Sequence, residues 1–322
     1  MKGLLQVARC TFLVMCLFFS VALVPADATE KLAFVRDGNI WIANTDGTGE
    51  KQLTSSREDG GPALSPDGSL VAYHSGHDER TGFGRIHLVP STGGTARIAA
   101  FAGMTGSEHP YFHPDGKRIL FVGLSNPRTK GKGDAAMTYA TMSVAIGDLE
   151  TAAARPIVQT KDVMLDAGYV YTAPSVSPDG RLFAYQASGS DVSGGFVLFD
   201  ENGKTVFQYP ARTADPTPFW RPLVSTDGKQ ILCYSPATSE KKRDAVYLVD
   251  RASGKRSLIA EGTHATFVDG GSAIVFEQWA DKWGEKARSD LWRLELARGA
   301  KARKIVTNAT QPAGQTVSVK AQ

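Results

Sequence analysis

A turn motif, Ser-Pro-Asp-Gly or a close variant of it, recurs along this chain, and a strand-like apolar stretch follows each copy. The aspartates of the clear copies are Asp67, Asp115, Asp179 and Asp227, spaced by 48, 64 and 48 residues, and a degenerate copy occupies 267–271. Proline fixes φ at the first turn position, the aspartate bonds back to its own backbone, and glycine takes the left-handed position. Each motif therefore predicts a tight turn between antiparallel strands, and repeats of about 40 to 50 residues built from strands indicate propeller blades.

The rest of each unit also reads as strands. Behind the turn come a second apolar strand, a variable loop, a third apolar strand, a short polar turn and an outer strand. The third strands are expected at 85–89, 142–146, 196–199, 246–249 and 291–294. No long helical period follows residue 25. The expected fold is therefore all-β, with four strands in each blade.

The first unit lacks its innermost strand. Its second, third and fourth strands are expected at 32–35, 39–43 and 50–54. The C-terminal segment 315–320 alternates apolar and polar residues and follows the last outer strand. We predict that this tail completes the first blade and closes a six-bladed ring, because closure removes open sheet edges. The alternative is a disordered tail.

The N-terminus has the composition of a secretory signal. Lys2 and Arg9 form a positive region, 11–24 is apolar, and Ala26-Asp27-Ala28 fits a cleavage site. An uncleaved anchor is the rival, but the apolar run is short for a span of about 20 residues. A lipoprotein with Cys16 is the weaker rival. We predict a signal peptide at 1–28, a propeller domain at 29–322, and a periplasmic or secreted protein.

Cysteine content and charge limit the function classes. The predicted mature chain keeps only Cys233, so no intramolecular disulfide is expected, which fits a bacterial periplasm better than a disulfide-rich animal module. The net charge of +3 is too balanced to indicate nucleic acid, and no recognition motif for it is present. We expect a monomer that is at most peripheral to the envelope.

The repeats resemble the TolB-like (WD-like) propeller family. The resemblance is carried by the five turn copies and by the first-blade ending at 44–54, where an Asp-Gly pair is followed by Gln-Leu-Thr. It covers nearly all of the predicted mature chain and implies the fold more specifically than the function. It implies a stand-alone propeller without the N-terminal α/β domain of TolB, acting as a binding module for a protein, peptide or anionic envelope ligand.

The second-to-third-strand loops and the links between blades are expected on one face. The loops at 76–84, 124–140, 187–195, 236–244 and 278–289 are long and irregular, and variable loops on a rigid scaffold are where binding usually occurs. A cationic rim for an acidic peptide or glycan is predicted from Arg128, Lys130, Lys132, Lys241, Lys242 and Arg243, with Trp279 and Trp283 as a packing pair or a ligand platform. The alternative is a solvated rim without a ligand.

Two blade links carry histidines at equivalent positions. His109 and His264 each precede the turn position by six residues, and Arg221 holds the same place in the fifth blade. The count places the histidines in blades three and six, on opposite sides of the channel. We predict that these three residues, with Glu108 nearby, surround the channel mouth and bind the ligand.

The sequence supports an enzymatic function less well than it supports a binding module. A divalent metal bound by His109 and His264 would suit a metal-assisted lyase or hydrolase acting on an acidic saccharide, since oligogalacturonate lyases are propellers with channel histidines and a metal. A metal site needs three or four ligands, and no third is evident. No Gly-x-Ser-x-Gly motif occurs. The expectation is therefore a binding module with no cofactor; a purely structural interaction domain is the remaining alternative.

Overall fold

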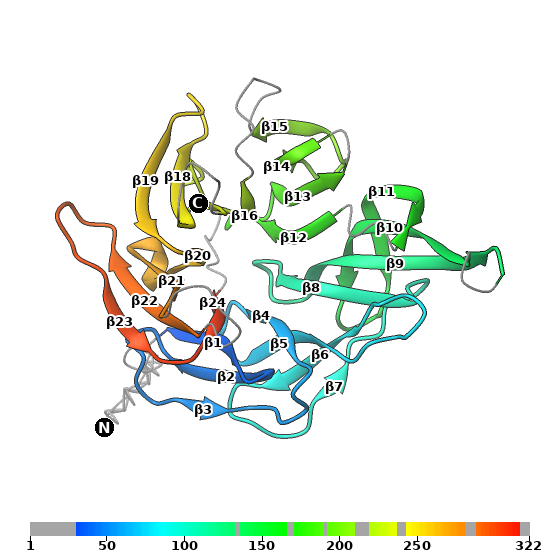
Figure 1. Cartoon of the computed structure of the whole chain (residues 1–322), viewed down its shortest axis with the longest axis horizontal. Coiled ribbons are helices and arrows are strands. Elements are labelled where there is room, and N and C mark those ends of the chain that lie inside the picture. Colours follow the sequence, from blue (N-terminus) through cyan, green and yellow to red (C-terminus); the bar gives the residue numbers. More distant parts are fainter. Residues whose placement is uncertain are drawn as a thin grey trace, which may run out of the picture.

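The computed structural model describes residues 30–132, 136–165, 171–189, 192–209, 219–236, 243–280 and 288–315. Six four-stranded antiparallel sheets stand around a central axis (Figure 1). The all-β, six-bladed propeller predicted from the repeat is confirmed. No helix within the described ranges has the length and apolar character needed to cross a membrane. The predicted signal peptide at 1–28 lies outside the described residues.

The first three blades follow the predicted order from the channel outward. Blade one consists of β24 (Thr310–Gly314), β1 (Lys31–Arg36), β2 (Asn39–Asn44) and β3 (Lys51–Gln52). Blade two consists of β4 (Gly60–Leu64), β5 (Leu70–Ser75), β6 (Arg85–Pro90) and β7 (Arg97–Ile98). Blade three consists of β8 (Gly106–Phe112), β9 (Arg118–Lys130), β10 (Met137–Asp148) and β11 (Ala154–Met164).

The remaining blades repeat the arrangement. Blade four consists of β12 (Tyr171–Val176), β13 (Phe183–Gly189), β14 (Val192–Phe199) and β15 (Thr205–Tyr209). Blade five consists of β16 (Trp220–Val224), β17 (Gln230–Ser235), β18 (Ala245–Asp250) and β19 (Arg256–Glu261). Blade six consists of β20 (Thr263–Val268), β21 (Ala273–Trp279), β22 (Ser289–Glu295) and β23 (Arg303–Val306). The degenerate copy of the turn motif forms the 3-10 turn η3 (Asp269–Gly271) between β20 and β21.

The repeated turn is held by side-chain hydrogen bonds. In blade two the Ser65 hydroxyl donates to Asp67 Oδ1 (2.6 Å) and accepts from the Leu70 N–H (2.9 Å). Gly68 takes the left-handed position at φ 69°. The Ser177 and Ser225 turns repeat this pattern. These bonds explain why the motif recurs: serine, aspartate and glycine each satisfy a separate requirement of the turn.

The ring closes through the C-terminal part of the chain, as predicted, but with a different segment. β24 pairs antiparallel with β1, with Leu32 opposite Gly314 and Val35 opposite Thr310. The strand therefore lies ahead of the predicted 315–320, of which 316–320 fall outside the described residues. The reason is local: Gln311-Pro312 begins this strand with the same kind of bulge that opens the other innermost strands.

Two of the expected loops are partly strand. β9 and β10 pair from Asp148↔Arg118 out to Met137↔Lys130, so much of the predicted 124–140 loop is a two-stranded ribbon that extends from the ring (Figure 1). In blade four, β13 and β14 likewise pair through part of 187–195. The residues of β9 beyond Leu124 are half-buried or exposed, so this part of the ribbon is held by its backbone pairing with β10 rather than by the core.

The core lies between neighbouring blades. Leu120 and Val144 of blade three pack with Val176 and Phe183 of blade four in one buried cluster. Cys233 is buried in the next interface, as its strand position predicts, and no disulfide reaches it among the described residues. Because neighbouring sheets pack face to face, the innermost strands are left to surround a central channel.

Candidate functional site

One residue of every innermost strand has a left-handed backbone. These six residues, which we call the ring positions, have φ between 46° and 56°: Gly61, His109, Ala173, Arg221, His264 and Gln311. The ladder to the neighbouring strand shifts register at each of them. Proline follows five of the six, and proline within sheets is confined largely to edges and bulges because it cannot donate to the ladder.

A β-bulge redirects a side chain, and here it does so once per blade. The structure thus places the predicted His109, Arg221 and His264 at equivalent points of β8, β16 and β20, in blades three, five and six. A left-handed backbone costs a residue other than glycine roughly 1–3 kcal/mol, so the surrounding sheet must hold it in place. The chain keeps this geometry at all six positions, so it belongs to the scaffold, and only the side chains differ.

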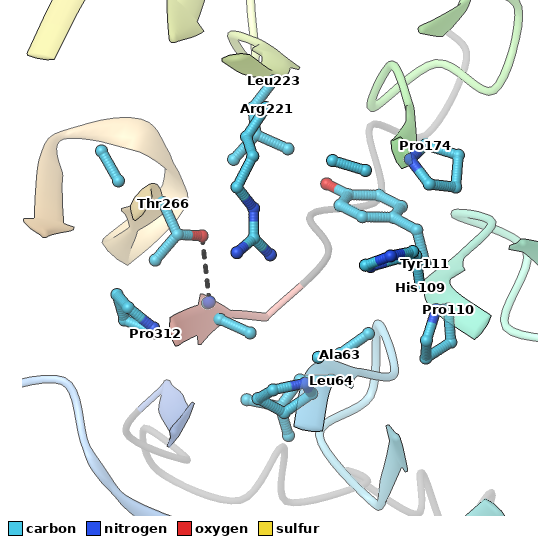
Figure 2. Close-up of a pocket in the computed structure, with 16 residues that line it drawn as sticks. Ala63, Leu64, His109, Pro110, Tyr111, Pro174, Arg221, Leu223, Thr266 and Pro312 are labelled. Carbon is cyan, nitrogen blue, oxygen red and sulfur yellow. Dashed lines mark hydrogen bonds between the residues drawn. The ribbon is translucent and has the colours of Figure 1, made fainter. Parts of the chain in front are cut away.

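Four of the ring positions, Gly61, His109, Ala173 and Arg221, line a cavity at the centre of the propeller, whereas His264 and Gln311 are not among its lining residues. The hollow measures about 610 Å³ when the open solvent at its mouth is included. Its walls are mostly prolines, alanines, leucines and backbone from the innermost strands, as Figure 2 shows. The polar side chains among its lining residues are His109, Tyr111, Arg221 and Thr266. A concave, largely apolar space with a few convergent polar groups is the usual form of a ligand pocket.

Arg221 is the charged group in this lining. Figure 2 shows its guanidinium pointing into the cavity, with the ring of Tyr111 on the opposite wall. Burial lowers the pKa of Arg221, although the group remains cationic at neutral pH. Within the described ranges, neither a hydrogen bond nor an ion pair holds this guanidinium. A desolvated cation without a bonded anion is costly, and a ligand anion would offset that cost.

His109 lies beside a histidine that the sequence analysis did not place in the site. The rings of His109 and His74 meet edge to face, with centroids 5.4 Å apart. A Cβ on Gly61 would lie 2.8 Å from the Nδ1 atom of His74, so glycine at that ring position leaves room for the imidazole. Burial lowers the pKa of both histidines, that of His109 to about 3. Both are therefore neutral at pH 7, and the His74 Nδ1 atom has no hydrogen-bond partner in the described chain.

His264 is oriented by a buried carboxylate. Its Nδ1 lies 3.1 Å from Glu277 Oε2 and 2.9 Å from Thr263 Oγ1. Burial lowers the pKa of His264. Burial acts to raise the pKa of Glu277, but the contacts with His264 and the further hydrogen bonds that the carboxylate accepts, such as that from the Gln311 N–H, together lower it. The pair is thus a neutral imidazole donating from Nδ1 to a carboxylate, which leaves Nε2 as the unprotonated nitrogen.

The other predicted site residues have more ordinary surroundings. The Glu108 carboxylate is buried and accepts a hydrogen bond from the Gly84 N–H (2.7 Å), which joins blades two and three. Glu108 is not among the cavity-lining residues. Its position, next to the bulge, turns its side chain toward the blade interface.

The predicted cationic rim is partly neutralised. Arg128 forms an ion pair with Asp162, and Arg243 Nη1 lies 2.7 Å from Glu261 Oε2. The Lys130 ammonium lies over the Tyr139 ring, and Lys132 is exposed. Trp279 is 41% exposed while its indole N–H donates to Asp244. Lys241, Lys242 and Trp283 lie outside the described residues.

The donor set near the cavity does not fit a metal ion. No group of three His, Cys, Asp or Glu gathers in the part of the chain that the structure describes. The Nδ1 atom of His264 is already bonded to Glu277, and the ring of His109 meets the ring of His74. A first-row metal needs three or more such donors within bonding distance.

His74 and Glu277 were recognisable from the sequence, although we did not predict them. Each lies seven residues after the Asp or Gly of its turn motif, at Asp67 and Gly270. In the ladder, these second-strand residues lie opposite the residue before the ring position: Gly60 pairs with His74 and Thr263 with Glu277. Counting seven residues from the turn motif would have indicated both of these side chains.

The fold and the cavity define a six-bladed β-propeller with a channel-mouth pocket. It is structurally similar to the C-terminal propeller of TolB. With TolB from Acinetobacter baumannii the TM-score is 0.62 at 21% identity, covering 90% of this chain and 68% of that one. With oligogalacturonate lyase from Vibrio parahaemolyticus the TM-score is 0.52 at 14% identity, covering 84% and 71%. Identities this low establish the fold alone.

Sequence similarity is confined to a short stretch. Over 76 residues, 23% of this chain, the identity is 40% to putative tricorn protease homolog 2 of Streptomyces coelicolor. This chain covers 6% of that protein's length. No protein-family model matches the chain. The distant match agrees with a propeller repeat shared among larger proteins.

Proposed function

We propose that this protein is an exported TolB-like binding module that takes an anionic ligand, or an anionic group of a protein or peptide, at the mouth of its channel. The observation that carries the proposal is Arg221, a cation directed into the cavity with no bonded carboxylate in the described structure. Rigid propellers position such groups without an ordering cost at the moment of binding.

Ligand capture with matched variants tests this function. Immobilised wild type, Arg221→Met and Arg97→Met are exposed to an envelope extract, and the retained species are identified by mass spectrometry. Arg97 is the control because it is exposed on the outer strand β7 and does not line the cavity. We expect an anionic species retained by wild type and Arg97→Met and lost from Arg221→Met. Equal retention by all three proteins, or retention of uncharged species only, would contradict the proposal.

The alternative function, a metal-assisted lyase or hydrolase of an acidic saccharide, has one observation in its favour. Glu277 orients His264 and leaves Nε2 available as a base. The described residues supply no metal ligand set, so the metal is the weaker part of this alternative. Metal analysis of the purified protein and an oligogalacturonate cleavage assay test it. Turnover lost in His264→Gln would support it, and absence of both metal and turnover would exclude it.

A further inference from the structure

The lining of the central cavity carries a single formal charge. Its sixteen residues, all within the described ranges, include Arg221 but neither Asp nor Glu. Burial lowers the pKa of His109 to about 3, so the imidazole that shares the lining is neutral at pH 7. The carboxylate that acts electrostatically on Arg221 is Glu277, which is outside the lining and bonded to His264. The cavity as a whole is therefore monocationic.

The walls around this charge are apolar. Prolines 62, 110, 174 and 312 come from four different blades, and Leu64, Leu223 and four alanines fill the space between them. Figure 2 shows these side chains on all sides of the Arg221 guanidinium. Such walls offer few hydrogen-bond partners to the hydroxyl groups of a sugar, whereas they suit methyl and methylene groups.

From this arrangement we propose that the cavity binds a terminal monocarboxylate on an apolar body, with the carboxylate on Arg221 and the apolar part against the prolines. The inference rests on the proposed function and specifies its ligand chemistry. The planar guanidinium fork matches a carboxylate with two parallel N–H···O bonds. The shared chemistry has two sources, a free organic acid and the C-terminus of a peptide that ends in an apolar residue.

The charge count disfavours polyanions. A phosphate group carries roughly −1.5 to −2 at pH 7, so on Arg221 alone it would leave negative charge in a low-dielectric space. An oligouronate would place a carboxylate on every sugar and find one cation in the lining. A monocarboxylate leaves the filled cavity neutral, which is the least costly state for a buried pair.

Isothermal titration calorimetry in a low-salt buffer tests the proposal with defined probes. Hexanoate is compared with hexanol, inorganic phosphate and digalacturonate, and the peptide acetyl-Leu-Ala-Leu is compared with its C-terminal amide. The variants are Arg221→Met, Arg221→Lys and the control Arg97→Met, on the exposed outer strand β7 and outside the cavity lining, each checked by circular dichroism. Because Arg221→Met removes a charge-assisted hydrogen bond, we expect its hexanoate binding to be at least about tenfold weaker, with unchanged binding in Arg97→Met.

The pairs of probes distinguish the two kinds of ligand and the results that would contradict the proposal. Tighter binding of the free-acid peptide than of hexanoate identifies a peptide terminus, and the reverse identifies a small acid; both support the proposal. Equal binding of hexanoate and hexanol, or of the peptide and its amide, overturns it. Phosphate or digalacturonate binding more tightly than hexanoate, with the same loss in Arg221→Met, overturns this inference but leaves the anion-binding function standing. If Arg221→Met fails to fold, Arg221→Lys and the wild-type probe series decide the same question.

Discussion

Because no ion pair holds Arg221 among the residues that the structure describes, we predict that its removal stabilises the unliganded protein. A fully buried ion carries an effective penalty of several kcal/mol, and Arg221 is partly open to the cavity, so about 1–2 kcal/mol should be recovered in Arg221→Met. Methionine keeps the length of the side chain and packs against the apolar walls. For a chain of this size, 1 kcal/mol corresponds to about 2 °C, so the melting temperature should rise by about 2–4 °C.

A second arginine provides the matched control. The Arg293 side chain is 10% exposed and pairs with Asp269 and, at 2.7 Å, with Glu295. Arg293→Met leaves both carboxylates without their partner, and because they are partly exposed the expected loss is about 1–3 kcal/mol. The two variants should therefore shift the melting temperature in opposite directions.

The assay is thermal unfolding followed by circular dichroism in a low-salt buffer without organic anions. An anion in the buffer would bind Arg221 in the wild type and mask the gain. If Arg221→Met lowers the melting temperature as Arg293→Met does, the guanidinium stabilises the folded state, and the reasoning that leads from its unpaired charge to a ligand is refuted.

Three further predictions concern pH and packing. The pKa of His109 is about 3 in the folded state, whereas an unfolded histidine titrates at about 6.5. The contribution of His109 to the free energy of unfolding is therefore fully present above about pH 6.5 and is lost as the pH falls toward 3. In denaturant titrations, His109→Gln should lose less stability than wild type as the pH falls, and an equal loss would contradict this reasoning. The hydrogen bond from the Ser225 hydroxyl lowers the pKa of Asp227, so Ser225→Ala should lower the free energy of unfolding by about 1 kcal/mol at pH 7. The difference between wild type and the variant should narrow below about pH 4, because the carboxylate becomes protonated there. A difference that stays constant with pH would argue against this role of Ser225. A Cβ at Gly314 would lie 2.1 Å from the Phe267 carbonyl oxygen, so Gly314→Ala should lower the unfolding free energy by about 2 kcal/mol. The control is Gly103→Ala, where φ is +77° but the space is open, and the expected loss is about 1 kcal/mol. Equal losses in the two variants would refute the clash at Gly314.

The fold was predictable because its information is local and repeated. The serine, aspartate and glycine of each turn satisfy bonds within a few residues, so the motif is visible without knowledge of the tertiary structure. The same counting placed His109 and His264 in blades three and six. Ring closure was predicted from the missing first strand, but the alternating segment 315–320 was chosen, whereas the strand that pairs with β1 is Thr310–Gly314.

The environment of the site could not be predicted, because it depends on contacts between blades. Nothing near Arg221 in the sequence shows which groups surround its guanidinium, whereas the pairing of Arg128 with Asp162 depends on the unforeseen extension of the β9–β10 ribbon. The contact between His74 and His109 joins side chains from neighbouring blades. Signal cleavage, export and the cationic rim remain predictions from the sequence.

The six ring positions separate the backbone of the pocket from its chemistry. Every blade supplies the same left-handed bulge, and the side chain there varies from none at Gly61 to a guanidinium at Arg221. A substitution at one of the four positions that line the cavity, Gly61, His109, Ala173 and Arg221, changes the pocket without altering a turn or the closing strand. The scaffold therefore suits redesign of ligand selectivity: a library randomised at these four codons would sample new pockets on a single folded framework, with the left-handed backbone as the main constraint on which residues are accepted.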